Sequence, residues 1–199
     1  HTGHFCCGQQ DVDYVLTTTE VTRMIKEAGI DLSQIEPEAL DMPFGLSSGA
    51  AAIFGVTGGV TEAVLRRLVH SSRMEDLQDI SFTGIRGIEG IKEASIQLED
   101  RTVKIAVVNG LRCAETLLER IKAGEVQYDF VEVMACKRGC IAGGGQPVPI
   151  GPRTKQARLD GMYKIDSMAQ IKRSDENPII AEVYEGILKG KEHKLLHNR

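Results

Sequence analysis

The chain has 199 residues, 42% of them apolar, so it is long enough to bury a core and is expected to form one domain or one large lobe. Its net charge of −4, its pI near 5.8 and its content of five Phe, four Tyr and no Trp argue against a nucleic-acid partner, because they provide neither a basic face nor a stacking surface. No apolar run approaches the roughly 20 residues of a membrane span, and the first residues do not resemble a signal peptide, so we expect no membrane span and a cytoplasmic location.

The first predicted elements are a short strand and a helix. Residues 11–18, "DVDYVLTT", are rich in β-favouring side chains and predict the strand. A helix follows, because Thr17 and Glu20 have the spacing of a capping box and Gly29 is a suitable stop. Its apolar stripe is Val21, Met24, Ile25 and Ala28. Irregular spacing and two prolines then predict a loop from Asp31 to Gly49.

The rest of the chain alternates between helices and strands. A helix is predicted from about Gly58, and residues 91–98 and 102–108 alternate as a β-hairpin. Further elements are a helix with an apolar stripe from Leu111 to Ile121, a strand at 129–135, a helix at about 153–169 and a helix capped by Asn177. No repeat is present, so the sequence predicts an α/β fold with a mixed β-sheet flanked by helices.

Two cysteines follow the predicted strand at 129–135. Five cysteines are too few and too unevenly placed for a disulfide scaffold, which favours metal or redox chemistry. Cys136 and Cys140 lie where α/β folds tend to bind ligands, and thiolates are soft ligands for zinc or iron–sulfur clusters. The spacing alone is equally compatible with a tight turn holding two buried thiols that bind nothing, since such metal sites more often use CxxC.

Three glycines and a glutamine follow the second cysteine. Gly143, Gly144 and Gly145 would let the backbone and its amide hydrogens approach a bulky inorganic group, and the side chain of Gln146 can donate a hydrogen bond. These four residues are therefore candidate cofactor-binding positions.

The residues around this spacing carry a family resemblance. The segment "EVMACKRGCIAGGGQP", residues 132–147, resembles the C-terminal signature of the FeFe (iron-only) hydrogenases. The resemblance extends over residues 11–32, 47–66, 86–94 and 176–197. It implies that residues 11–199 form the C-terminal lobe of that family's two-lobed catalytic domain, and that residues 1–10 do not match.

The resemblance also implies roles for five residues. Cys136 resembles a ligand of a 4Fe-4S cubane, and Cys140 resembles the ligand that bridges this cubane to a di-iron unit. Met134 resembles a side chain that packs on the di-iron unit, and Phe54 and Gly55 resemble the segment that lines the same pocket.

The implied activity is the reversible oxidation of dihydrogen to protons and electrons at this composite cluster. The implied partners are the N-terminal lobe, in the same or a separate chain, and an electron carrier such as ferredoxin or an NAD(P)-linked subunit. The alternative is an iron–sulfur binding or sensory module of the same fold that turns over little or no hydrogen.

Two family motifs do not occur in this chain. They are a Cys-Cys-Pro element and a Met-Pro-Cys element with a following lysine, which supply the other two cluster ligands in the family. Cys6 and Cys7 have no such neighbours, although either remains a candidate ligand. We therefore expect a truncated chain or one half of a split enzyme, and His in place of Met at residue 1 agrees with a piece of something longer.

Three other features have simpler interpretations. Cys113 is expected to be a small core residue. Residues 55–64 resemble a phosphate-binding helix start but lack the lysine of a P-loop, which favours a wall of the cofactor pocket. His193 and His197 are expected on a surface tail rather than at a metal.

Overall fold

A computed structural model describes residues 5–6, 9–10, 12–36, 38, 41, 45–68, 90–97, 101–137 and 139–196. Its helices are α1 (Thr18–Glu27), α2 (Gly49–Ala52), α3 (Gly59–Leu68), α5 (Leu111–Lys122), α6 (Pro152–Met168), α7 (Pro178–Glu185) and α8 (Glu192–Leu196), with 3-10 turns η1 (Ile53–Gly55), η2 (Cys140–Ala142) and η3 (Ser174–Glu176). Its strands are β1 (Phe5–Cys6), β2 (Gln9–Gln10), β3 (Ile91–Gln97), β4 (Thr102–Asn109) and β5 (Phe130–Met134). Within these residues, no helix is both long enough and apolar enough to cross a membrane.

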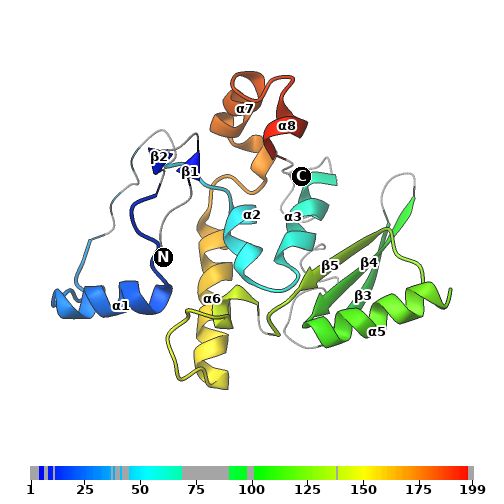
Figure 1. The fold of residues 1–199 in the computed structure, drawn as a ribbon, viewed down its shortest axis with the longest axis horizontal. Helices are drawn as coiled ribbons and strands as arrows, with labels where there is room; N and C mark the ends of the chain where they lie inside the picture. The colour runs from blue at the N-terminus through cyan, green and yellow to red at the C-terminus, as the bar shows by residue number, and fades with distance from the viewer. Residues whose placement is uncertain are drawn as a thin grey trace.

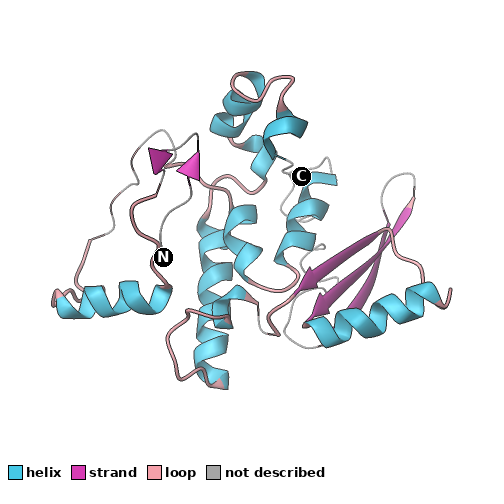
Figure 2. Ribbon diagram, in the orientation of Figure 1, coloured by secondary structure: helices cyan, strands magenta, loops and turns pink. Residues whose placement is uncertain are grey.

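The main sheet has three strands in the order β3-β4-β5 (Figures 1 and 2). β3 and β4 pair antiparallel, with Ile91 opposite Val108, and this confirms the predicted hairpin. β4 and β5 pair parallel, with Asn109 opposite Met134. The prediction of a mixed sheet flanked by helices is confirmed. The turn residues of the hairpin, 98–100, lie outside the described residues.

The central strand β4 is buried on both faces, which explains its nearly continuous apolar sequence. On one face, Ile105 and Val107 pack with Leu65 of α3. On the other face, Val108 packs with Leu117 of α5. The sheet is therefore the middle layer between two helices.

A second core lies beside the sheet. It joins η1, η2 and α6 through buried Ile53, Ile141 and Leu159. Figure 1 shows α6 running past α2 through the middle of the molecule, and the two helices are in contact. This core contains the residues that precede α3 and those that follow the second cysteine, so it links two sequence segments of the candidate site.

A buried charge network connects α3 to α6. The Arg66 guanidinium donates to both carboxylate oxygens of Asp166, with each nitrogen–oxygen distance 2.7 Å, and to Glu62 Oε1 at 2.5 Å. The three side chains are at most 8% exposed. Burial disfavours the charged form of Arg66, but the hydrogen bonds that Arg66 donates to Asp166 and the negative charges of Glu62 and Asp166 outweigh this effect, so the pKa of Arg66 is raised.

The N-terminal part of the chain departs from the sequence prediction. Helix α1 begins after Thr17 with the expected capping box, and Gly29 follows it with φ +69°. The predicted strand at 11–18 is wrong, because residues 12–17 form no strand and residue 18 begins α1. Within the predicted loop 31–49, the last residue instead starts the short helix α2, which Ser48 caps.

The charge network gives a first test. Replacing Arg66 with Ala leaves two buried carboxylates without their guanidinium, so we expect the free energy of unfolding to fall by about 3–5 kcal/mol. The measurement is urea denaturation followed by circular dichroism. The control is Arg67→Ala, because the Arg67 side chain is 60% exposed and lies 3.4 Å from Asp175, and exposed pairs contribute about 1 kcal/mol or less. Equal losses in the two variants would contradict the structural role of the network.

Candidate thiol site

One buried carboxylate anchors β5, the strand that precedes the cysteines. Glu132 is 6% exposed, and its Oε1 accepts a hydrogen bond from the Gly58 amide at 2.7 Å. Its Oε2 accepts from the amide and the hydroxyl of Thr61, both at 2.7 Å. Glu132 thus satisfies free N–H groups in the first turn of α3, where the helix dipole also favours a negative charge. The same contact occupies the helix start that the sequence suggested as a phosphate site.

The loop after β5 packs against the turn before α3. Gly139 has φ +72°, and a Cβ there would lie 3.0 Å from the Gly55 carbonyl oxygen and 3.3 Å from the Thr57 nitrogen. The Gly139 amide donates to the Cys136 carbonyl at 3.0 Å, which closes the turn between the cysteines. Glycine is therefore required at 139 both for its conformation and for the close approach.

Both cysteine side chains of this loop are exposed and reduced. A Cβ on Gly143 would lie 3.4 Å from Cys136 Sγ, so the glycine backbone runs directly beside this sulfur. The alternative of two buried thiols is therefore wrong. The side chains of Cys136 and Cys140 are available for an external ligand.

Cys140 opens into a groove of about 520 Å³. Gly55 and Gln146 line the same groove, so three of the predicted site residues meet there. Met134 lies half-buried at the end of β5, and Phe54 of η1 is 47% exposed. Neither of these two is among the residues that line this groove.

Two contacts that hold the glycine-rich loop were not predicted from the sequence. Arg158 of α6 donates to the carbonyls of Ile141 and Pro147, each at 2.8 Å, and thereby brackets the loop. The amide and hydroxyl of Thr19 both donate to the Gly145 carbonyl at 2.9 Å. The sequence shows only that these residues are able to donate hydrogen bonds. It does not show their partners, since each contact joins positions far apart in the chain or on different elements.

The expected donor Gln146 also bonds to α1. Its side-chain amide donates to Thr18 Oγ1 at 3.2 Å. Thr18 lines the groove together with Cys140. The first turn of α1 therefore contacts the glycine-rich loop through both its backbone and its side chains.

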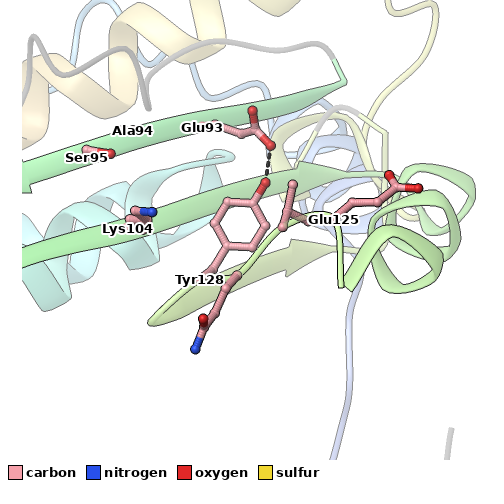
Figure 3. Close-up of a pocket in the computed structure, with 8 residues that line it drawn as sticks. Glu93, Ala94, Ser95, Lys104, Glu125 and Tyr128 are labelled. Carbon is pink, nitrogen blue, oxygen red and sulfur yellow. Dashed lines mark hydrogen bonds between the residues drawn. The ribbon is translucent and has the colours of Figure 1, made fainter. Parts of the chain in front are cut away.

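A second hollow, of about 370 Å³, lies on the sheet away from the thiols (Figure 3). In it the Tyr128 hydroxyl donates to Glu93, and Arg120 Nη1 lies 3.4 Å from the same carboxylate. Partial burial and this hydrogen bond raise the pKa of Tyr128. The hollow contains no cysteine or histidine, so it has no part in thiol chemistry.

The other cysteine and histidine residues considered from the sequence add no metal ligand to this site in the described part of the chain. Cys113 is half-buried and packs against the core beneath α5, which confirms the structural interpretation. His193 lies in α8 near the C-terminus, and His197 is outside the described residues. In the described part of the chain, no group of three or more His, Cys, Asp or Glu side chains is arranged to hold a metal ion.

Comparison with known proteins identifies two matching family profiles. Residues 3–144 match the family described as iron only hydrogenase large subunit, C-terminal domain, and residues 152–199 match iron hydrogenase small subunit. The NADP-reducing hydrogenase subunit HndD of Solidesulfovibrio fructosivorans is 41% identical over 195 residues, which cover 96% of this chain and 33% of HndD. Cytosolic iron-sulfur assembly component 3 of Mus musculus is 31% identical over 202 residues, covering 96% of this chain and 41% of that protein.

A solved structure has the same fold. The FeFe-hydrogenase HydA(deltaEFG), whose structure is described as revealing stepwise H-cluster assembly, superposes with a TM-score of 0.68 at 35% identity. The match covers 96% of this chain and 56% of HydA. The chain thus spans about a third of HndD and little more than half of this structural neighbour.

The close approach at Gly139 gives a second test. We expect Gly139→Ala to lower the free energy of unfolding by roughly 1–3 kcal/mol, because the conformation φ 72°, ψ 179° is essentially restricted to glycine and the methyl group crowds the Gly55 carbonyl. Gly144→Ala is the control, since a Cβ there meets nothing within 4 Å. Urea midpoints of the two variants measure the difference, and a Gly139→Ala protein as stable as the control would rule out the tight contact.

Proposed function

Because this chain belongs to the family of iron-only hydrogenase large subunits, C-terminal domain, we propose that it is the C-terminal lobe of an FeFe hydrogenase catalytic domain. The proposed reaction of the complete domain is the reversible oxidation of dihydrogen to two protons and two electrons. The observation that carries the proposal is the pair of exposed thiols, Cys136 and Cys140, on a loop that Gly139 holds against Gly55.

The residues present fit half of a cluster-binding site. Two thiolates are soft donors suited to iron, and a 4Fe-4S cubane usually takes four such ligands. The described residues supply two free thiols on this loop and no third donor grouped with them. We propose that Cys136 would hold the cubane and that Cys140 would be a ligand of both the cubane and the di-iron unit. The bound cluster would supply the redox chemistry and the iron position at which dihydrogen is split.

The chain's own residues would shape the surroundings of the thiols. Gly143 runs beside Cys136 Sγ without a side chain, which leaves room for a bulky group. Arg158 fixes two loop carbonyls and brings a positive charge to the groove that contains Cys140. That charge would favour an anionic group there. We assign Gly144, Gly145 and Gln146 to the same cofactor-binding loop.

Two apolar positions would complete the wall on this side. Met134 ends β5 two residues before Cys136, and Phe54 adjoins Gly55. We propose that both side chains pack on the di-iron unit and exclude water. The 47% exposure of Phe54 in this chain is consistent with a surface that the rest of the domain covers.

The proposed partners are the rest of the catalytic domain and an electron carrier. The carrier would be ferredoxin or an NAD(P)-linked subunit, and HndD is by its name part of an NADP-reducing enzyme. A second candidate function is a non-catalytic iron–sulfur module, which the similarity to cytosolic iron-sulfur assembly component 3 favours. The two candidates differ in one measurable property, because only the first produces hydrogen when its cluster is complete.

The number of donors predicts how the isolated chain behaves. With two ligands of four, the 199-residue chain coexpressed with maturation enzymes should neither retain the complete cluster nor evolve hydrogen. A fusion that carries the N-terminal half of the HndD catalytic domain upstream of residue 11 should recover both. Anaerobic hydrogen evolution from reduced methyl viologen and iron counted per chain are the measurements. A fusion that holds the cluster but evolves no hydrogen would refute the hydrogenase assignment and support the assembly module. Activity in the isolated chain would instead refute the prediction that this lobe is incomplete, because it would require ligands beyond Cys136 and Cys140.

Substitutions of the two cysteines should have different effects on the cluster of the fusion. Cys140→Ser is expected to remove the infrared bands of the carbonyl and cyanide ligands together with activity, because Cys140 is assigned to both parts of the cluster. Cys136→Ser affects the cubane alone and should leave an altered iron content. Cys113→Ser is the control, since Cys113 is a residue of α5 that packs against the core, and its substitution should leave iron and bands unchanged. If iron and bands survive in both loop variants, the ligand assignment is wrong.

A further inference from the structure

Arg158 of α6 joins the two ends of the glycine-rich loop. Its Nη1 donates to the Ile141 carbonyl and its Nη2 donates to the Pro147 carbonyl, both at 2.8 Å. A guanidinium is planar and rigid, so these two bonds fix the separation and the direction of the two carbonyls together. Ile141 directly follows Cys140, and Pro147 directly follows Gln146. One side chain therefore shapes the whole segment after the second cysteine.

The charge of Arg158 has no counter-charge within the described part of the chain. Arg66, Arg120, Arg158 and Arg173 are the arginines of that part that are not exposed. The other three each meet a carboxylate, whereas Arg158 meets two neutral carbonyls. A half-buried charge without a partner of opposite sign is unfavourable, so this position favours a bound anion.

The groove beside Arg158 contains no acidic side chain that could be this anion. Arg158 and Cys140 line the groove together, and its described lining includes no Asp or Glu. A cubane held by thiolates is anionic, because the charges of its thiolates and sulfides outweigh those of its irons. The reduction potential of such a cluster depends on the net charge around it. A nearby cation stabilises the reduced form, which carries one more negative charge, and therefore raises the potential.

We propose that Arg158 is a positioning residue for the cubane assigned above to Cys136 and Cys140. It holds the segment from Ile141 to Pro147 in its binding conformation before iron arrives, and its charge raises the reduction potential of the bound cubane. The inference rests on the proposed function, because it takes the cubane as the anion in the groove. It deepens that function by naming the residue that sets how readily the cluster accepts an electron.

Two substitutions separate the loop contact from the charge. Arg158→Lys keeps the positive charge but loses the planar fork that holds both carbonyls. Arg158→Gln loses both the fork and the charge. The control is Arg153→Gln, which removes the same charge from an exposed position in the first turn of the same helix. Leu159 keeps α6 packed in the second core in every variant, and unchanged exchange at the β4 amides is the check that each variant folds.

The first measurement is a redox titration of the fusion described above, reconstituted with iron and sulfide alone and followed by electron paramagnetic resonance. Arg158→Gln should lower the ratio of reduced to oxidised cubane at a fixed potential about tenfold, the order of effect of one unit charge in a partly desolvated groove. That ratio corresponds to about 59 mV for one electron. Arg158→Lys should stay within about threefold of the unmodified fusion, because the charge remains. Arg153→Gln should have no effect, since salt screens an exposed charge.

The second measurement is amide hydrogen exchange in the isolated 199-residue chain, which tests the loop contact without a cluster. The amides of Ala142, Gly143 and Gln146 donate to carbonyls of the same loop. Both Arg158 variants should speed exchange at these amides at least about tenfold, because two charge-assisted hydrogen bonds to the loop are lost. Arg153→Gln should leave these rates unchanged.

The outcomes separate this inference from the proposed function. The role of the charge is overturned if Arg158→Gln and Arg153→Gln give the same potential, or if Arg158→Lys lowers the ratio as much as Arg158→Gln. Unchanged loop exchange in both Arg158 variants overturns the positioning role. A fusion with the expected potentials that evolves no hydrogen retains the role of Arg158 and refutes the hydrogenase function. A fusion that takes up no cubane refutes the proposed function and the role of the charge, while exchange in the isolated chain still decides the positioning role.

Discussion

The three hydrogen bonds that Glu132 accepts join the two parts of the molecule on which the thiol site depends. One part is the sheet, whose strand β5 carries Glu132, and the other is α3 with the η1 turn before it. A buried carboxylate without partners would cost several kcal/mol or more, so β5 and α3 cannot shift independently. Cys136 lies four residues after Glu132, and Gly55 lies three residues before Gly58. The contact between Glu132 and Gly58 therefore restricts the positions of both Cys136 and Gly55.

The other end of α3 is held by a different kind of contact. Arg66 joins the helix to Asp166 of α6 by two parallel hydrogen bonds. A buried ion pair adds little to the net stability of a protein, but any arrangement that separates the two charges is strongly destabilised. The pair therefore favours the one arrangement of α3 and α6 in which Arg66 and Asp166 meet. With Glu132 at its start and Arg66 near its end, α3 acts as a fixed axis between the sheet and α6. The loop from Cys136 to Pro147 is supported from both sides of that axis, by Gly139 at Gly55 and by Arg158 of α6.

The sequence predicted the elements whose patterns are local. The β-hairpin, the capping box of Thr17 and the helix start at Asn177 were all confirmed, because each depends on residues within a few positions. The strand at 11–18 failed because a strand needs a neighbour, and none of the described residues provides one. Helix α2 was missed because it has four residues and its position depends on α6, where Asp166 fills the space that a side chain on Gly49 would need.

In the candidate site, too, the local motif was predicted from the sequence and the long-range contacts were not. The cysteines and glycines form a contiguous motif, and the structure places Cys140, Gly55 and Gln146 around one groove. Glu132, Arg158 and Thr19 stabilise this groove through contacts with residues on other elements. A single sequence does not indicate which distant residues are in contact, so these three roles were not predicted.

The exposure of Cys136 and Cys140 has a chemical consequence of its own. Accessible thiols are oxidised to sulfenic acid or to disulfides, neither of which binds iron. If these thiols hold iron as proposed, oxidant and iron would compete in air for the same two sulfur atoms, and iron would bind only while both thiols are reduced.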